Sequence, residues 1–398
     1  MAMSTALSRV SPGERERVWS AYNEFISSNP QTQAVAAAPT TTASPMGGRG
    51  ASRPKKEFVM VPVLYATDRE PIKGLTLDQW REQFRAKGSQ VAYFSDEHDN
   101  TRIHYGYCTV SVPEAVHRAG DLERPPWYRK ENLVYDITLR RLIPLKPGQM
   151  KERIAQLASR SADNDAFVFI HGYNVAFNDA VMRTAQISYD FAFRGAPILF
   201  SWPSSGALRD YARDGESIDL AVDSLHHFLD DIVLKTGAKK IHLVAHSMGN
   251  RLLLRTLKKF SDQGRSALFG EIIFAAADVP KREFTAADPR KIAALGRRVT
   301  IYASSKDHAL VASARFNNSD RLGESGAKLF LADGIDSIDA SEVDTDMLHH
   351  SYFANARPVI LDLARLLALG VAPNVKPREL KPDTRGDLRF WLVGRPAK

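Results

Sequence analysis

Residues 240–260 place a serine at the junction between an apolar run and a helical repeat. The apolar run extends from Ile241 to Ala245 and stops at His-Ser-Met-Gly, residues 246–249. Leucines then recur at positions 252, 253, 254 and 257, a spacing that predicts an amphipathic helix. We therefore expect a buried strand, a sharp turn and a helix in direct succession, with Ser247 at the apex of the turn.

This succession predicts a nucleophile elbow, in which small residues flank a tight turn so that a serine hydroxyl projects above the sheet. The common pattern is Gly-x-Ser-x-Gly, and here Ala245 stands at its first position and Gly249 at its last. Alanine is small enough to let the helix pass the strand. The helix N-terminus behind Ser247 also favours negative charge that develops nearby. The alternative is a tight strand–helix turn with an inert serine.

The chain around the elbow predicts a mostly parallel sheet covered by helices on both faces, because short apolar runs alternate with helical patterns from residue 165 onward. Strands are expected at 166–170, 198–201, 241–245, 271–276, 299–303 and 329–332. Helices are expected at about 177–193, 216–234, 249–260, 281–295, 307–315 and 355–369. Upstream, three predicted strands at 58–67, 102–112 and 133–145 lack long helices between them, which predicts an antiparallel N-terminal extension of the sheet.

The folded part is expected to span residues 57–370 as one domain. Residues 1–56 are expected to be flexible, since 29–56 are rich in Ala, Thr, Pro, Gly and Ser, although 14–28 can form a short amphipathic helix. Residues 371–398 contain seven basic and three acidic side chains. We expect this segment to be a solvated basic tail.

The cysteine content fits a reducing compartment. The single cysteine, Cys108, excludes an intramolecular disulfide. No apolar run approaches the ~20 residues that span a bilayer, and no secretory signal is visible at the N-terminus. A cytoplasmic location is therefore expected.

The net charge of +8 suits an anionic surface or substrate. The basic tail could make peripheral contact with a membrane, whereas no nucleic-acid-binding motif accompanies it. The sequence has neither a metal-ligand cluster with useful spacing nor a dinucleotide-type glycine loop. No cofactor or metal is expected.

The run from Phe169 to Asn174, Phe-Ile-His-Gly-Tyr-Asn, ends the first central strand where an oxyanion hole is needed. One backbone N–H of such a hole comes from the residue after the nucleophile, here Met248, and one from the loop after this earlier strand. Gly172 would allow close approach, which leaves the N–H of Tyr173 or Asn174 as the second donor. Tyr173 is preferred, and a plain turn is the alternative.

Two aspartates compete for the acid that orients a catalytic histidine. Asp307 follows the strand expected at 299–303, and Asp278 follows the strand before it. Both come after the serine in the chain, as this order of residues requires. Asp307 is preferred, although either aspartate could instead cap the next helix.

The same order leaves three histidines for the base. His308 adjoins Asp307 too closely in sequence to meet it easily. His349 and His350 precede the last expected helix, in the expected loop, and His350 is preferred. His246 lies beside the nucleophile but should point elsewhere because side chains alternate along a strand.

Five short runs form a specific combination: Val61-Pro-Val-Leu-Tyr-Ala-Thr-Asp-Arg69, His171-Gly-Tyr-Asn174, Ser201-Trp-Pro-Ser204, Ala245-His-Ser-Met-Gly249 and His350-Ser-Tyr-Phe353. Together they resemble a bacterial family of α/β-hydrolases of unknown function, over about residues 57–369. The resemblance implies the α/β-hydrolase fold and an esterase- or lipase-like triad. Here that triad falls on Ser247, Asp307 and His350.

We therefore expect a serine hydrolase that acts on a small-molecule ester or a lipid. His350 would deprotonate Ser247, the amides of Met248 and Tyr173 would hold the oxyanion, and water would release the acyl group. Trp202 and Tyr211 could pack an acyl chain or belong to the core. Two alternatives are a lipid acyl hydrolase at anionic membranes and an inactive α/β-hydrolase scaffold that binds a protein.

Overall fold

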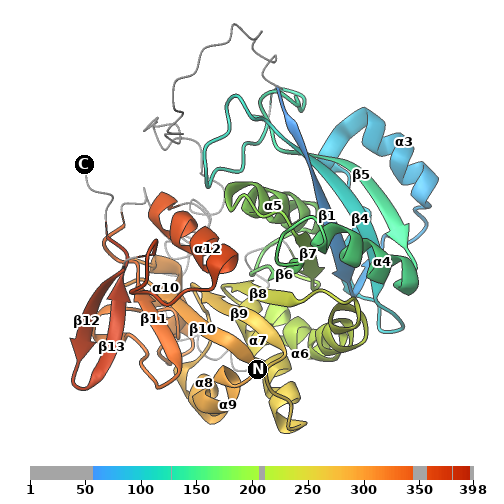
Figure 1. Ribbon diagram of the computed structural model, residues 1–398. Helices are drawn as coiled ribbons and strands as arrows, with labels where there is room; N and C mark the ends of the chain where they lie inside the picture. The colour runs from blue at the N-terminus through green and yellow to red at the C-terminus, as the bar shows by residue number, and fades with distance from the viewer. Residues whose placement is uncertain (1–56, 127, 206–210, 344–355, 379, 395–398) are drawn as a thin grey trace, which may run out of the picture.

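The computed structural model describes residues 57–394, except 127, 206–210, 344–355 and 379. The helix considered at 14–28 lies outside the described residues. Within them, eleven strands form one sheet, and a second, two-stranded sheet pairs β2 (Arg69–Pro71) with β3 (Phe94–His98). Figure 1 shows the large sheet running through the whole domain.

The order of strands across the large sheet is β12 (Lys381–Arg385), β13 (Leu388–Leu392), β11 (Ile335–Asp339), β10 (Gly296–Ala303), β9 (Phe269–Ala275), β8 (Lys240–His246), β6 (Asp165–Ile170), β7 (Ala196–Ser201), β1 (Val59–Thr67), β4 (His104–Val112) and β5 (Thr138–Leu145). All neighbours from β13 to β1 are parallel. β4 and β5 extend the sheet in antiparallel fashion. The predicted fold class, a mostly parallel sheet with an antiparallel N-terminal extension, is confirmed.

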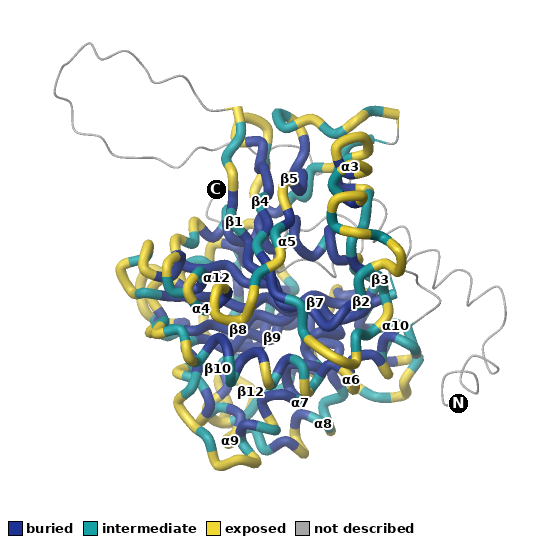
Figure 2. The backbone as a smooth tube through the Cα atoms, turned by 90° about the vertical axis from the view of Figure 1, so that its right-hand side faces the viewer, coloured by how far each residue is buried: buried dark blue, intermediate teal, exposed yellow. Residues whose placement is uncertain are grey.

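Helices cover both faces of the sheet because its central strands are apolar on both sides. In β6, every residue is buried. Val168 packs into the core under α4 (Pro147–Ala158), α6 (Tyr211–His227) and α7 (Gly249–Asp262), whereas Phe167 packs into the core under α5 (Phe177–Asp190) and α12 (Arg357–Leu369). Figure 1 shows α6 and α7 on one side and α5 and α12 on the other, and Figure 2 shows buried central strands between them.

The connections reverse direction beside β6, which makes the carboxyl ends of β6 and β8 a topological switch point. After β6 the chain adds β7 on one side and then returns to place β8 on the other, before β9 and β10 continue outward. Ile170 of β6 and Ala245 of β8 are paired in register, so both strands end at the same edge. Ligands of open parallel sheets bind outside the carboxyl ends of the strands at such a switch point.

Several expected elements differ in the structure. The helix α3 (Leu77–Lys87) lies between β1 and β4, where no long helix was expected, and the strand expected at 133–145 begins only at Thr138. The apolar run at 329–332 forms no strand; instead Leu329 packs with Ala303 and Phe390, and Phe330 meets Phe284 edge-on. The next strand, β11, begins only after a turn at Gly334, whose φ is +79°. The helix expected at 281–295 is divided into α8 (Lys281–Ala286) and α9 (Pro289–Ala293), because Asp288 caps a new helix that starts with proline.

The C-terminal residues expected as a basic tail contribute two strands to the sheet. β13 pairs with β11 in parallel, and β12 pairs with β13 as a hairpin. Phe390, Trp391 and Val393 are buried. These apolar side chains anchor residues 371–398 on the domain, although that segment has more basic than acidic side chains.

Candidate active site

Ser247 lies between β8 and α7 with a backbone φ of +51°. Its N–H donates to the carbonyl of Ala275 at 3.1 Å, and its carbonyl accepts from the N–H of Asp278 at 3.1 Å. The side chain of Asn250 also donates to the carbonyls of Ser247 and Ala275, each at 3.0 Å. The turn is therefore fixed to the end of β9, the strand next to β8.

Two glycines let the turn pass the end of β6. A Cβ at Gly249 would lie 2.3 Å from the carbonyl oxygen of His171. A Cβ at Gly172 would lie 2.9 Å from the Cβ of Ser247. Because real Cβ contacts do not approach so closely, both positions require glycine for the observed packing. The structure thus brings the loop after β6 against the predicted nucleophile.

Tyr173 and Asn174, the two candidate oxyanion donors after Gly172, differ in their surroundings. Asn174 has a φ of +57°, and its N–H points to the carboxylate of Asp214 at 3.5 Å, the outer limit of a hydrogen bond. Tyr173 is buried, and its ring meets that of Tyr211. Met248 occupies the N-cap position of α7. The choice of Tyr173 as the second donor, beside Met248, stays a prediction.

Asp214 binds the loops that follow β6 and β7. Its carboxylate accepts from the Ser204 hydroxyl at 2.6 Å and from the Ser205 N–H at 2.9 Å. Burial raises the pKa of Asp214, although the hydrogen bonds from Ser204 and Ser205 act to lower it. The same carboxylate thus joins the loop after β6 to the loop after β7.

Arg69 lies fully buried behind these loops. Its guanidinium donates to the Ser201 hydroxyl at 3.0 Å and to the carbonyls of Ser95, Ser204 and Val175 at 3.1, 3.2 and 2.8 Å. Burial lowers its pKa to about 10, so it remains a cation at neutral pH. Sequence reasoning assigned no role to Arg69 or Asp214, although Arg69 ends one of the runs that carry the family resemblance.

His171 supports the site as a neutral side chain. Its ring stacks on Trp202 with centroids 5.2 Å apart, its Nε2 lies 3.0 Å from the Ser201 hydroxyl, and Trp202 Nε1 donates to its carbonyl at 2.8 Å. Burial, and then the charge of Arg69, lowers the pKa of His171 to about 3. Trp202 is fully buried and belongs to the core.

The carboxylate of Asp307 is buried beyond the end of β10. One of its oxygens accepts from the Leu310 N–H at 3.0 Å and caps α10 (His308–Phe316). The helix cap considered for this residue is therefore present, and it occupies one carboxylate oxygen.

The carboxylate of Asp278, the alternative acid, is surrounded by four side chains. It accepts from Tyr211 and Ser313 at 2.6 Å each, and forms ion pairs with Arg251 at 2.9 Å and Arg321 at 3.2 Å. Burial acts to raise its pKa, but the two guanidinium groups outweigh burial and hold the pKa well below its usual range. None of these four partners is a histidine.

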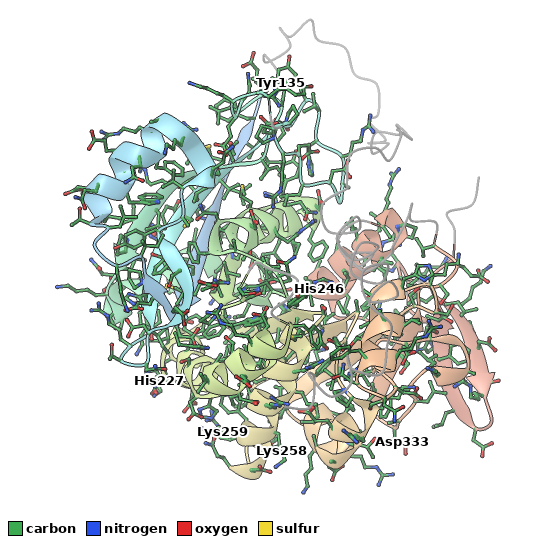
Figure 3. All side chains as sticks on the ribbon, turned by 180° about the vertical axis from the view of Figure 1, so that it is seen from behind. Tyr135, His227, His246, Lys258, Lys259 and Asp333 are labelled. Carbon is green, nitrogen blue, oxygen red and sulfur yellow. The ribbon has the colours of Figure 1, made fainter. Side chains whose placement is uncertain are left out.

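The two histidines considered as base, His349 and His350, lie outside the described residues. His246 lies in the middle of the molecule in Figure 3, whereas His227 lies at its edge. His227 is more than half exposed and pairs with Asp231 on the surface of the helix. His308 begins α10 directly after Asp307.

The described residues contain no group of three or more His, Cys, Asp or Glu side chains that could hold a metal ion. A cavity of about 510 Å³ lies beside α10, where Ser304, Arg315 and Ser325 contribute to its wall. Ser247 is not among its lining residues. Among the described helices, none is both long enough and apolar enough to cross a membrane.

Solved structures that resemble this one are distant. They include a mutant of the esterase rPPE (9% identity, TM-score 0.31, covering 75% of this chain and 90% of that one) and a lipase-esterase related protein from Clostridium acetobutylicum (10%, 0.27, 50% and 93%). Phospholipase PlaB from Legionella pneumophila has 14% identity and a TM-score of 0.21 over 50% of this chain and 45% of that one. Likenesses this low support no conclusion about this chain.

Sequence comparisons identify the family. An uncharacterized protein of Nostoc sp. is 27% identical over 118 residues, which cover 23% of this chain and 31% of the relative. The chain thus matches less than a third of the length of this curated relative. The family model described as "Alpha/beta hydrolase of unknown function (DUF900)" matches residues 146–368, more than half of the chain. This protein therefore belongs to that family of alpha/beta hydrolases.

Proposed function

We propose that this protein is a serine hydrolase that cleaves carboxylic esters, with Ser247 as nucleophile, His350 as base and Asp307 as the acid that orients the base. The backbone of Ser247 carries the proposal. Its φ of +51° is unfavourable for a residue with a side chain and costs about 1–3 kcal/mol. Such strain is typical of functional sites, and at a strand–helix elbow it projects a hydroxyl above the sheet.

In the proposed reaction, His350 takes the proton of Ser247 while the serine oxygen attacks the carbonyl carbon. The N–H groups of Met248 and Tyr173 stabilise the oxyanion. The protonated His350 then returns its proton to the leaving alcohol, and an acyl-enzyme forms. Water, deprotonated by His350, attacks this ester and releases the acid with free Ser247.

Asp307 is preferred as the acid because it follows β10, two strands after the elbow strand β8, where its buried carboxylate also caps α10. Asp278 serves two arginines and two hydroxyl groups at once. A histidine that approached Asp278 would have to displace one of these partners and leave a buried charge or hydroxyl unsatisfied, which costs about 1–3 kcal/mol or more.

A fluorophosphonate probe tests the proposal on the purified full-length chain. Wild type should be labelled, Ser247→Ala should not, and His350→Ala should be labelled at least ~10³-fold more slowly. Asp307→Asn should slow labelling more than Ser313→Ala, which removes one hydrogen-bond donor to the carboxylate of Asp278. The control Ser111→Ala removes another buried serine hydroxyl, 2.8 Å from that of Thr138 in the antiparallel part of the sheet.

If folded wild type is not labelled, the serine hydrolase proposal is wrong, and the alternative of a protein-binding scaffold takes its place. If labelling occurs, a panel of esters, thioesters and amides of different acyl length identifies the substrate class. Phospholipid vesicles in the same panel test the lipid hydrolase.

A further inference from the structure

Asp278 is connected to both sides of the oxyanion hole, once through the backbone and once through Tyr211. We propose that Asp278 and Tyr211 are positioning residues, which hold the Ser247 elbow and the Tyr173 loop at a fixed separation during catalysis. The inference rests on the proposed hydrolase function and adds residues to it. We refer to Asp278, Tyr211, Arg251 and Ser313 together as the Asp278 clamp.

The first connection joins the clamp to the elbow. The N–H of Asp278 donates to the carbonyl of Ser247 at 3.1 Å. Arg251, one helical turn after Ser247 in α7, donates through Nε to the carbonyl of Asp278 at 2.6 Å and through Nη2 to its carboxylate at 2.9 Å. The segment after β9 therefore cannot move without moving the elbow and the first turn of α7.

The second connection joins the clamp to the loop after β6. The Tyr211 hydroxyl donates to Asp278 Oδ2 at 2.6 Å, and the Ser313 hydroxyl donates to Oδ1 at 2.6 Å. The ring of Tyr211 meets that of Tyr173 nearly perpendicularly, with centroids 5.4 Å apart and an angle of 69°. Tyr173 supplies the proposed second oxyanion donor, so the side chain of the donor residue packs against a ring that Asp278 anchors.

Neighbouring charges keep Asp278 ionised and Tyr211 protonated. Arg251 and Arg321 place two cations around the carboxylate, which keeps Asp278 ionised. Burial, and then the charge of Asp278, raises the pKa of the Tyr211 hydroxyl. Tyr211 therefore remains a donor and Asp278 an acceptor across the neutral range. The Arg251 guanidinium also lies 5.4 Å from the centre of the Tyr211 ring and limits its rotation.

If the Asp278 clamp is purely structural, its disruption should lower the stability of the protein without affecting stabilisation of the oxyanion. If the clamp positions the site, its disruption must also lower turnover, because a displaced oxyanion donor loses part of the ~10²–10³-fold contribution that such a donor makes. Substrate binding in the ground state should change little. The two roles are therefore separated by kcat and KM, measured beside the melting temperature.

The chain offers a matched control in Tyr302. The hydroxyl of Tyr302 also donates at 2.6 Å to a buried carboxylate, Asp362, which is itself paired with an arginine, Arg378. This second tyrosine–aspartate–arginine set faces the core under α5 and α12, away from α6 and α7. Tyr302→Phe therefore removes the same type of hydrogen bond without touching the Asp278 clamp.

The experiment compares Tyr211→Phe, Tyr211→Leu and Tyr302→Phe in the full-length protein, with a fluorophosphonate and p-nitrophenyl acetate as probes. Tyr211→Phe keeps the ring but loses its anchor, and kcat should fall about 10-fold with KM within about twofold. Tyr211→Leu removes the ring behind Tyr173 and should lower kcat by about 10². Tyr302→Phe should lower the melting temperature as much as Tyr211→Phe and leave kcat unchanged.

Equal kcat for Tyr211→Phe and Tyr302→Phe overturns the positioning role, provided that Ser247→Ala abolishes labelling. That result would leave the serine hydrolase proposal intact. If wild type is not labelled, or if Ser247→Ala is still labelled, the hydrolase proposal fails, and the positioning role fails with it.

Discussion

Gly172 lies so close to Ser247 that the two residues cannot both carry a side chain without a shift, since a Cβ at Gly172 would be 2.9 Å from the Cβ of Ser247. Gly172, in the loop after β6, therefore packs directly against the side chain of the proposed nucleophile. Gly172→Ala should move the serine by several tenths of an ångström and lower kcat/KM of ester hydrolysis by about 10–10²-fold.

The matched control for this substitution is Gly215→Ala in α6, where an added Cβ meets nothing within 4 Å. It should leave turnover unchanged and raise the unfolding free energy by about 0.5–1 kcal/mol, since alanine is the better helix residue. Unchanged turnover in Gly172→Ala would contradict the packing described for the elbow.

Glu271 should make the protein less stable as the pH rises through neutrality. Neither oxygen of this buried carboxylate has a hydrogen-bond partner within the described residues. Burial raises its pKa to about 7 from an ordinary 4.5, although Arg298 acts to lower it. Because the folded state binds the proton more tightly, stability is complete below the unfolded pKa and decreases as the pH rises from about 4.5 to about 7.

The expected loss is about 3 kcal/mol over this window. Urea unfolding at pH 5 and pH 8 measures it. Glu271→Gln mimics the protonated side chain and should reduce the difference between the two pH values by about this amount, while the contribution of His117 remains. A wild type with equal unfolding free energies at the two pH values would show that Glu271 is not protonated in the folded protein near neutrality.

His117 should contribute a second loss of stability at higher pH. The imidazole lies between Glu123 at 2.9 Å and Asp190 at 2.7 Å. Burial acts to lower its pKa, but the hydrogen bonds to Asp190 and Glu123 outweigh burial and raise the pKa to about 9. The stabilisation is therefore present below the ordinary pKa of about 6.5 and is lost as the pH rises through about 9.

The loss at His117 should amount to about 2–3 kcal/mol between pH 6.5 and 9.5, and His117→Gln should abolish it. An NMR titration of the His117 ring measures the pKa directly. A midpoint near 6.5 would mean that the two carboxylates do not share a charged imidazole.

The C-terminal hairpin should be required for folding. Besides the pairing of β13 with β11, Arg378 donates to Asp362 of α12 through Nε at 2.7 Å and Nη2 at 2.9 Å, in a fully buried ion pair. Arg378→Met leaves Asp362 as an uncompensated buried charge and should cost about 3–5 kcal/mol. Differential scanning calorimetry should show a large decrease in melting temperature.

Deletion of residues 371–398 should likewise prevent stable folding, and the shortened chain should aggregate. Arg389→Ala, on an exposed position of β13, is the control and should lower the unfolding free energy by no more than about 1 kcal/mol, since it loses only the contact of the guanidinium with the Trp391 ring. A soluble, active deletion variant would show that the hairpin is only an appendage.

The elbow and the alternation of strands and helices could be predicted from the sequence because they depend on neighbours within one or two turns. The network beneath the site could not. Arg69 binds Ser201, Ser204 and Val175, which are 132, 135 and 106 residues away. No local pattern encodes such contacts.

The role of Asp278 illustrates the same limit. Its place after a strand fits a catalytic acid, but only the fold brings Arg251, Arg321 and Tyr211 around its carboxylate. In the C-terminal segment, the count of basic side chains obscured the apolar run from Phe390 to Val393. The choice of His350 over His349 stays a prediction, since both lie outside the described residues.

Peptide mapping by mass spectrometry after fluorophosphonate treatment determines directly whether Ser247 is the nucleophile. One adduct per chain is expected, on the peptide that contains Ser247, and no adduct in Ser247→Ala. An unlabelled wild-type protein with an intact melting transition, or an adduct on another residue, would contradict the assignment of Ser247 as the nucleophile.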